Sequence, residues 1–437
     1  MKQDKKNLIL DADELQKKLN QIKLKKIEDI RCGDVLHYPI LDIVDYLDTY
    51  ISSKKERLKA VPRIIKNSCV DNYEFIMDGK ADILFLFSNS SRGRDDHLKA
   101  FMNAQELYEN RLTMKCTGKQ FTTVGLKILP LAVVWNRQMK EVVQNFTIRS
   151  ILIATLVQCC LDYQIFIKKA HKDNLNIKAL VSYCDVMPVD CFFTQKFNSH
   201  KKITVTLQHG TFIVKTNAWA YAGAKSKYFL AESPYTVDCA KRAGYKGITM
   251  PVGSPHQLEA SLREKPKSFK AEKLGLFLNS PMRPHEDNIQ AINVLQEYCK
   301  KNNCKLLIKY HPANDQSIYE KIIDKEVSTT YGTDISAVEF GNMIDVAVVN
   351  ASTVFNTMLS QWIPVLLFER KGYAPEMFFG VDELTFFNVE ELKKKLHWIL
   401  SDEFYERMDS YRNYFLCSGD LKTNYKNAFS EIKSIFA

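Results

Sequence analysis

Short apolar runs alternate with amphipathic segments along most of the 437 residues of this chain. The apolar runs are rich in β-branched and aromatic residues and end in polar loops, a pattern typical of buried parallel strands. The clearest runs in the first half are 82–88, 178–185, 203–207 and 227–233. Segments with a helical period separate them. The alternation predicts a doubly wound α/β domain, in which helices cover both faces of a parallel sheet.

The same alternation starts again in the second half of the chain. A charged stretch that contains Lys265-Pro266-Lys267 has the composition of a linker. The strand-like runs after it are 273–279, 305–310, 327–331, 346–350 and 364–368. We therefore predict two Rossmann-like domains. The predicted units are an N-terminal helical extension (1–75), a first domain (76–258), a linker (259–272), a second domain (273–405) and C-terminal helices that cross back to the first domain (406–437).

Two segments raise the question of a membrane. Residues 13–28 place apolar side chains on one helical face among several lysines, which fits either a helix docked on the protein surface or one that contacts a membrane. The most apolar stretch, 148–167, is too polar for a span and predicts a buried helix. It is interrupted by Arg149, Gln158 and Asp162.

The composition leaves several classes of partner open. Lysine and arginine exceed aspartate and glutamate by 61 to 51, a formal net charge of +10. This excess suits an anionic substrate, an anionic membrane surface or nucleic acid, and it does not choose among them. The 11 cysteines include no Cys-x-x-Cys pair, and several lie in apolar runs. We therefore expect reduced core thiols in a cytoplasmic protein, with no zinc site.

Polar residues follow three of the predicted strands at the point where each strand ends. These residues are Gln208-His209-Gly210-Thr211, His311-Pro312 and Ser352-Thr353. Ligands of open α/β sheets bind at the carboxyl ends of the strands. The three strand ends therefore predict one active site built from both domains.

The two histidines have residue types and positions that fit sugar and phosphate chemistry. An imidazole can take a proton from a hydroxyl near neutral pH, which makes His209 a candidate base, and Lys215 can steady an anionic substrate. His311 can hydrogen-bond or protonate a leaving phosphate, and Lys309 shares its strand face. The alternative for each histidine is a structural role, and single His-Pro pairs are common.

Further candidates for the donor side lie in the second half. Ser352 and Thr353 precede a helical segment, where hydroxyls and free N–H groups bind phosphate or simply cap the helix. Arg283 and His285, in the loop after the strand at 273–279, are candidates for a diphosphate, and Glu339 for sugar or ribose hydroxyls. A solvated surface charge is the alternative for the charged members of this group.

The loop after the first strong strand supplies candidates for the acceptor. Arg94 and Asp95 lie in a polar segment between the strand at 82–88 and a helical pattern, which also describes an ordinary polar turn. Several known site patterns are missing from the sequence. It has no Gly-x-Gly-x-x-Gly after a strand, no P-loop, no Asp-x-Asp at a strand end, and no EF-hand spacing, which disfavours dinucleotide oxidoreductases, P-loop ATPases and metal-dependent single-domain transferases.

The three strand-end motifs, in this order, resemble bacterial glycosyltransferases of the GT-B architecture, in which two Rossmann-like domains face a cleft. The resemblance is to enzymes of capsule, teichoic acid, lipopolysaccharide and related surface-polysaccharide synthesis. CDP-glycerol glycerophosphotransferases share the His-Gly motif, and bacterial sialyl- and polysialyltransferases share the His-Pro and Ser-Ser/Thr motifs. The resemblance covers residues 200–370 and hardly touches the first 150.

This resemblance implies a metal-independent, inverting transferase without a cofactor. The substrates it implies are a nucleotide-activated donor, which supplies a sugar or a polyol phosphate, and a glycan or lipid-linked acceptor. His209 matches the base candidate, His311 the donor-phosphate group, and Ser352 and Thr353 the hydroxyl pair. The chain lacks the Asp/Glu-Asp-Gly motif of the sialyltransferases and has Gln208 where the glycerophosphotransferases usually have an aromatic residue. The donor nucleotide therefore stays open among CMP, CDP and UDP.

Two other functions fit the same architecture. One is a nucleotide-sugar 2-epimerase, which would act without an acceptor. The other is a non-catalytic component of a polysaccharide assembly machine, which would have no reason to keep three strand-end motifs. For the transferase and for the epimerase we expect no nucleic-acid partner. We expect a cytoplasmic protein that approaches the inner face of the cell membrane through its basic surface.

Overall fold

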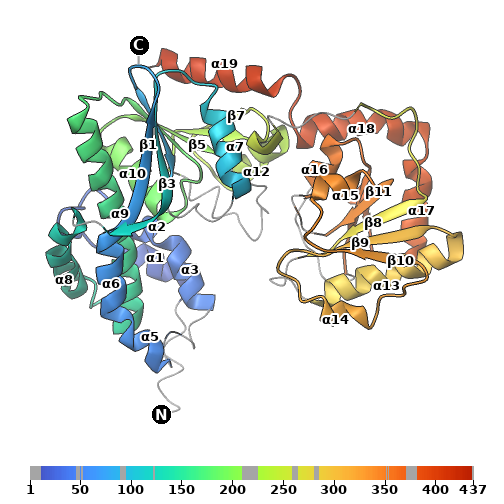
Figure 1. Cartoon of the computed structure of the whole chain (residues 1–437), viewed down its shortest axis with the longest axis horizontal. Coiled ribbons are helices and arrows are strands. Elements are labelled where there is room, and N and C mark those ends of the chain that lie inside the picture. The colour runs from blue at the N-terminus through green and yellow to red at the C-terminus, as the bar shows by residue number, and fades with distance from the viewer. Residues whose placement is uncertain are drawn as a thin grey trace.

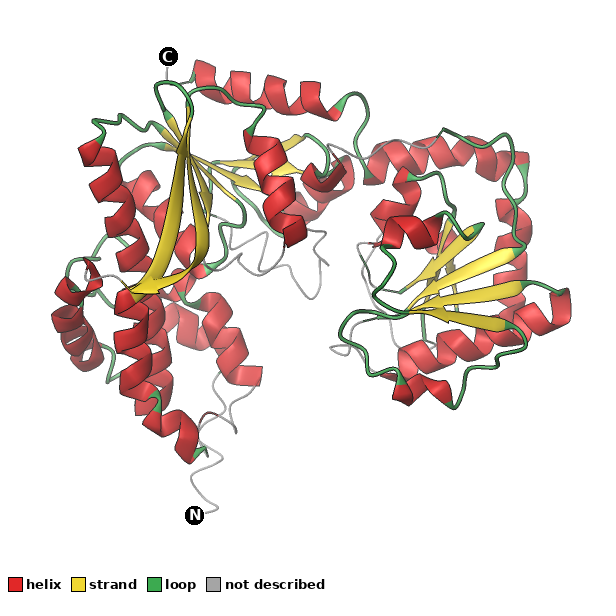
Figure 2. Ribbon diagram, viewed as in Figure 1, coloured by secondary structure: helices red, strands yellow, loops and turns green. Residues whose placement is uncertain are grey.

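The computed structural model has two α/β domains, each built on its own sheet (Figure 1, Figure 2). It describes residues 11–45, 50, 53–88, 95–121, 124–208, 225–257, 264–279, 285–350, 352, 354–370 and 381–435. The predicted α/β class with two doubly wound domains is therefore confirmed.

The first domain holds a seven-stranded sheet in the order β1-β3-β2-β4-β5-β6-β7. Its strands are β1 (Val70–Met77), β2 (Ile83–Phe87), β3 (Arg111–Phe121), β4 (Ala179–Ser182), β5 (Ile203–Leu207), β6 (Tyr228–Ala231) and β7 (Ile248–Pro251). All neighbours pair in parallel except β1, which runs antiparallel to β3 at the edge. Every residue of β2, β4, β5 and β6 is buried, which explains why these strands are rich in apolar and β-branched residues and carry no charge.

Helices surround this sheet. The structure corrects two predictions for the N-terminal segment, the length of its first helix and its purely helical character. The helix predicted over 13–28 ends at Gln21, because Ile22 is extended. Its leucines, Leu15 and Leu19, are buried in the domain core, so its apolar face is docked on the protein. The strand β1 begins at Val70, inside the segment for which helices were predicted. The helices are α1 (Ala12–Gln21), α2 (Cys32–Val35), α3 (His37–Asp45), α5 (Lys54–Leu58), α6 (Ala60–Cys69), α7 (Asp95–Gln105), α8 (Leu129–Gln138), α9 (Phe146–Lys172), α10 (Pro188–Ser199) and α12 (Pro234–Arg242), with 3-10 turns η2 (Val124–Lys127) and η3 (Pro255–Gln257).

The long helix α9 is a core helix of this domain, as predicted. Among the described residues it is the one helix long and apolar enough to cross a membrane, yet most of its length is buried against its neighbours. Its polar groups are satisfied internally. Arg149 donates to the side-chain oxygen of Asn136 at 2.7 Å, and Gln158 donates to Asp162, which also accepts from the hydroxyl of Tyr73 at 2.8 Å.

The second domain has a six-stranded parallel sheet in the order β10-β9-β8-β11-β12-β13. Its strands are β8 (Lys273–Phe277), β9 (Lys305–Lys309), β10 (Ser328–Tyr331), β11 (Val346–Val349), β12 (Val365–Phe368) and β13 (Thr385–Phe386). Its helices are α13 (His285–Asn302), α14 (Ser317–Glu320), α15 (Ala337–Gly341), α16 (Val354–Ser360), α17 (Val389–Ile399) and α18 (Asp402–Phe415), with the 3-10 turn η4 (Asp382–Leu384). The chain moves outward from β8 to β10 and then returns to β11 on the other side of β8. The order therefore reverses between β8 and β11, the place where open α/β sheets bind ligands.

The last helix, α19 (Leu421–Ser434), returns to the first domain and lies along it (Figure 1). The hydroxyl of Tyr425 donates to the carbonyl of Gly253 at 3.1 Å, and the ring of Phe429 meets that of Phe85 with centroids 5.7 Å apart. The predicted return of the C-terminal helices is confirmed.

Candidate functional site

The carboxyl edge of the second sheet gathers several of the predicted donor-side residues. His285 opens α13 after β8, and His311 follows β9. Lys309 is the last residue of β9, Glu339 lies in α15 after β10, and Ser352 follows β11. Because all of these strands are parallel, their carboxyl ends meet at one edge of the sheet.

Two residues after the end of β8, the main chain of Asn279 binds the side chains that position both histidines. Its N–H donates to the side-chain oxygen of Asn288 at 2.9 Å. Its carbonyl accepts from the amide nitrogens of Asn288 at 3.3 Å and of Asn314 at 3.0 Å. Asn279 and Asn288 are buried. The end of β8 is therefore a rigid hub between the loops that follow β8 and β9.

Asn314 fixes the loop that carries His311. Its side-chain oxygen accepts from the main-chain N–H of His311 at 2.8 Å. The ring nitrogen Nδ1 of His311 accepts from the N–H of Ala313 at 3.1 Å. A backbone N–H can only donate, so Nδ1 carries no proton in this arrangement and the neutral ring carries its proton on Nε2. The exposed imidazole of His311 can therefore act as a hydrogen-bond donor through Nε2.

His285 belongs to the same network. Its Nδ1 lies 2.8 Å from the hydroxyl of Tyr319, and that hydroxyl lies 2.9 Å from the amide nitrogen of Asn288. The hydrogen bonds from His285 through Tyr319 and Asn288 therefore lead to the backbone of Asn279. The hydrogen bonds from His311 through Asn314 lead to the same backbone. The structure thus brings together two of the predicted residues, His285 and His311, through residues that the sequence analysis did not select.

Lys309 and Glu339 already have partners within the protein. The ammonium of Lys309 donates to the carbonyls of Gly332 at 2.8 Å and Ile335 at 2.6 Å, and burial lowers its pKa. Glu339 forms a capping box with Ser336 at the start of α15, and the backbone N–H of Ser336 lowers the pKa of its carboxyl. Both residues thus hold the segment between β10 and α15. Their roles in donor binding stay predictions.

The end of β11 lies next to β8, where the strand order reverses. Ser352 accepts the N–H of Val354 on its hydroxyl oxygen at 3.3 Å, as a residue before a helix does. Asn350 is buried and its side-chain oxygen has no hydrogen-bond partner in the described part of the chain. Buried amides of this kind are rarely left unpaired. Asn350 is therefore a polar group at this edge that the sequence analysis missed.

The carboxyl edge of the first sheet is lined by buried polar groups. Gln208, which follows β5, accepts the N–H of Glu232 at 2.8 Å, and Glu232 accepts the hydroxyl of Ser254 at 3.1 Å. The predicted acceptor residue Asp95 is exposed at the first position of α7. Gln208, the first residue of the His-Gly motif, is therefore held by hydrogen bonds that connect the loops after β5, β6 and β7.

A cluster of aromatic and titratable groups at this edge was not predicted. The hydroxyl of Tyr183 lies 3.3 Å from Nε2 of His256, and the ring of His97 lies against both, with centroids 5.5 Å and 5.4 Å away. Beside the end of β2, Ser88 donates a hydrogen bond to the buried carboxyl of Asp190. The only sequence signal for this cluster is that each histidine follows a strand, since His97 comes after β2 and His256 after β7.

Five of the predicted site residues lie outside the described residues. They are His209, Lys215, Arg94, Arg283 and Thr353. Their roles as base, acceptor-binding groups and donor-binding groups stay predictions.

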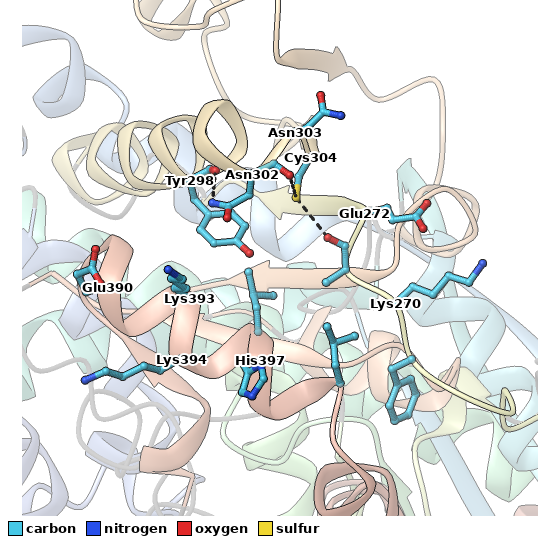
Figure 3. A pocket seen from close by; sticks show the side chains of 14 residues that line it. Lys270, Glu272, Tyr298, Asn302, Asn303, Cys304, Glu390, Lys393, Lys394 and His397 are labelled. Atoms are coloured by element: carbon cyan, nitrogen blue, oxygen red, sulfur yellow. Dashed lines mark hydrogen bonds between the residues drawn. The ribbon is translucent and has the colours of Figure 1, made fainter.

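A separate cavity of about 870 Å³ lies at the opposite edge of the second sheet (Figure 3). Its walls are the segment before β8, the end of α13 with Cys304, and one side of α17. It carries Lys270, Lys393, Lys394 and His397, together with Glu272 and Glu390. This edge holds the amino ends of the strands, so the cavity has no part in the site described above.

Comparison with known proteins finds similarity in fold. No protein-family model and no curated protein sequence match the chain. Similar solved structures include the S. aureus MnaA–UDP co-structure, with 8% identity over 81% of this chain and 97% of that chain and a TM-score of 0.48. The lipopolysaccharide outer core galactosyltransferase WaaB in its apo form has 10% identity over 80% of this chain and 99% of that chain, with a TM-score of 0.48. The Methanocaldococcus jannaschii UDP-GlcNAc 2-epimerase in complex with UDP-GlcNAc and UDP has 12% identity over 64% of this chain and 82% of that chain, with a TM-score of 0.41.

Proposed function

We propose that the chain is a glycosyltransferase that moves a sugar, or a polyol phosphate, from a nucleotide-activated donor to a cell-surface glycan acceptor. The observation that carries this proposal is the pair His285 and His311, both tied to the main chain of Asn279 at the carboxyl edge of the second sheet. Such an edge, at the reversal of strand order, is where open α/β sheets bind nucleotides. The order of the His-Gly, His-Pro and Ser-Thr motifs along the chain supports the same function.

For transfer of a sugar, the proposed reaction is an inverting displacement at the sugar carbon that is bonded to the donor phosphate; for transfer of a polyol phosphate, the acceptor oxygen attacks the phosphorus next to the polyol and the nucleoside monophosphate leaves. His209 takes the proton of the acceptor hydroxyl, and in sugar transfer the new bond between that oxygen and the carbon forms as the bond to the phosphate oxygen breaks. His311, Ser352 and Thr353 donate hydrogen bonds to the departing nucleotide phosphate. Donors that meet developing charge in this way typically contribute about 3–4 kcal/mol each.

The two sheet edges divide the substrates in this proposal. The nucleotide binds at the second domain, and the glycan or lipid-linked acceptor binds at the first, close to Gln208 and Asp95. We propose that no metal ion takes part. Transfer should then keep its rate in the presence of excess EDTA, and a loss that added Mg²⁺ restores would refute this point.

Binding of free nucleotides is the first test. Thermal unfolding of the full chain is followed with CMP, CDP, UDP and GDP, because a ligand that binds only the folded state stabilises it by about 2.7 kcal/mol at one hundred times its Kd. We expect one base to be preferred. No shift with any of the four nucleotides, at millimolar concentration, would contradict a nucleotide-donor site.

Substitution of the two histidines is the second test. His209→Ala and His311→Ala should each abolish transfer while the fold survives, and His397→Ala, at the opposite edge of the second sheet, is the matched control and should keep full activity. Near wild-type turnover in both His209→Ala and His311→Ala would overturn the assignment. Release of an epimerised nucleotide sugar in the absence of acceptor would show a 2-epimerase instead.

A further inference from the structure

We propose that Tyr319 is a positioning residue, which fixes His285 in the neutral form that carries its proton on Nε2. A series of hydrogen bonds connects Asn279 to His285 through Asn288 and Tyr319, and only one assignment of donors and acceptors satisfies all of them. In this assignment the hydroxyl of Tyr319 donates to the imidazole of His285. The inference deepens the proposed function, on which it rests only for the identity of the ligand, a nucleotide phosphate.

The direction of the chain is set by the main chain of Asn279. A backbone N–H can only donate, so the atom of Asn288 that lies 2.9 Å from it must be the amide oxygen. The amide nitrogen of Asn288 then faces the carbonyl of Asn279, at 3.3 Å, which can only accept. Both contacts give the same orientation of the side-chain amide.

The second step runs from Asn288 to Tyr319. The amide nitrogen of Asn288 lies 2.9 Å from the phenol oxygen, and an amide nitrogen can only donate, so that oxygen accepts. Tyr319 is fully buried, and burial raises its pKa, so the phenol keeps its proton. The partner that remains for this proton is Nδ1 of His285, at 2.8 Å.

The reverse arrangement would leave a buried hydroxyl without an acceptor. If Nδ1 of His285 carried the proton, it would donate to the phenol oxygen of Tyr319, and the phenol O–H would lose its partner. An unsatisfied buried polar group of this kind disfavours a state by roughly tenfold to a hundredfold. His285 is therefore held with an unprotonated Nδ1 and an N–H on Nε2.

His311 shows the same form for an independent reason, since its Nδ1 accepts the N–H of Ala313. The strand-end hub at Asn279 thus carries two imidazoles that both present Nε2–H donors. Two neutral donors fixed in this way are suited to the oxygens of a phosphate group, because neither ring has to change its tautomer when the ligand binds.

The tautomer of His285 can be measured directly. Nitrogen-15 NMR of the full chain labelled at its nine histidines distinguishes protonated from unprotonated ring nitrogens, and His285→Gln assigns the signal. We expect an unprotonated Nδ1 in the wild-type protein near neutral pH. A wild-type signal with the proton on Nδ1 would overturn the proposal without any need for a variant of Tyr319.

Tyr319→Phe removes the donor to Nδ1 and should give a mixture of both tautomers. UDP and CDP are the probes for affinity, and we expect the better of the two to bind roughly threefold to tenfold more weakly to this variant. Tyr310→Phe is the matched control, because Tyr310 is buried and its ring packs against that of Tyr319, and it should leave both the tautomer and the affinity unchanged. An unchanged His285 signal in Tyr319→Phe would refute the positioning role.

The two proposals fail separately. The NMR result on wild-type His285 decides the role of Tyr319, whether or not a nucleotide binds. Absence of binding of CMP, CDP, UDP and GDP by the wild-type chain counts against the proposed function alone.

Discussion

The buried carboxyl of Asp190 should make the folded protein lose stability as the pH rises from about 4 to about 7. Asp190 lies in the first turn of α10 and is fully buried. Burial raises its pKa to about 7, against the opposing effect of the hydrogen bonds from Ser88 and from the backbone of Tyr183 and Cys184. An aspartate in the unfolded chain has a pKa of about 3.9. Between these two values the folded state keeps a proton that the unfolded state has released.

The size of the effect follows from the difference between the two pKa values. About three pKa units correspond to roughly 4 kcal/mol, or about 1.4 kcal/mol for each pH unit in this range. Since the folded state binds more protons than the unfolded state here, the free energy of unfolding must fall as the pH rises. Asp190→Asn removes the titrating proton and keeps the side-chain oxygen that accepts from Ser88. The variant should therefore lack this part of the pH dependence.

The assay is urea unfolding at about pH 5 and about pH 7, followed by tryptophan fluorescence, to which Trp135, buried in the first domain, contributes. Relative to the wild-type protein, Asp190→Asn should gain about 2 kcal/mol between these two conditions, because Asp190 is half ionised in the folded state at about pH 7. Asp13→Asn, at an exposed position of α1, is the control and should follow the wild-type slope. Parallel curves for wild type and Asp190→Asn would mean that Asp190 is ionised in the folded protein, and the reasoning would fail.

Three further predictions test the fold and the strand-end hub. Gly253 has a φ of 96°, and an added Cβ would lie 2.3 Å from Cδ2 of Leu421, so Gly253→Ala should lower the free energy of unfolding by about 2 kcal/mol in urea titration. Lys309→Met removes two hydrogen bonds to loop carbonyls and should lower stability by about 1–3 kcal/mol; an unchanged melting temperature would speak against that structural role. Asn314→Ala frees the His311 loop, and calorimetry should show about tenfold weaker nucleotide binding, a loss on the order of 1.4 kcal/mol.

Hydrophobic periodicity predicted the fold where strands are buried on both faces. The run 203–207 is β5, and every position in it is buried, so its apolar character does not depend on neighbours elsewhere in the chain. The same rule failed for β1, an edge strand with polar residues such as Glu74 and partly exposed aromatic ones. Its strand conformation comes from pairing with β3, about forty residues away, which local sequence does not reveal.

The site was predictable only as far as strand ends determine it. That His285 and His311 would lie at one edge followed from the parallel strands before them. The sequence did not predict that both histidines would be hydrogen-bonded to the backbone of Asn279 through other side chains. The contact of Tyr319 with Asn288 joins residues 31 positions apart and depends on how α13 packs on the sheet. For Glu339 a local signal existed and was overlooked, since Ser336 three residues before it forms the Ser-x-x-Glu pattern of a capping box.

The chemistry of the two sheet edges supports the division of substrates between the domains. The groups that hold His285 and His311 are amides, a phenol and backbone N–H groups, which add no negative charge beside a phosphate. The described edge of the first domain contains the buried carboxyl of Glu232. At the second edge the buried carboxyl of Asp287 is paired with the guanidinium of Arg370 at 3.0 Å. A carboxylate repels a nucleotide phosphate, and it can accept a hydrogen bond from a sugar hydroxyl. A nucleotide is therefore expected at the second domain and a hydroxyl-rich acceptor at the first, and tight nucleotide binding that survives substitution of both His285 and His311 would contradict this arrangement.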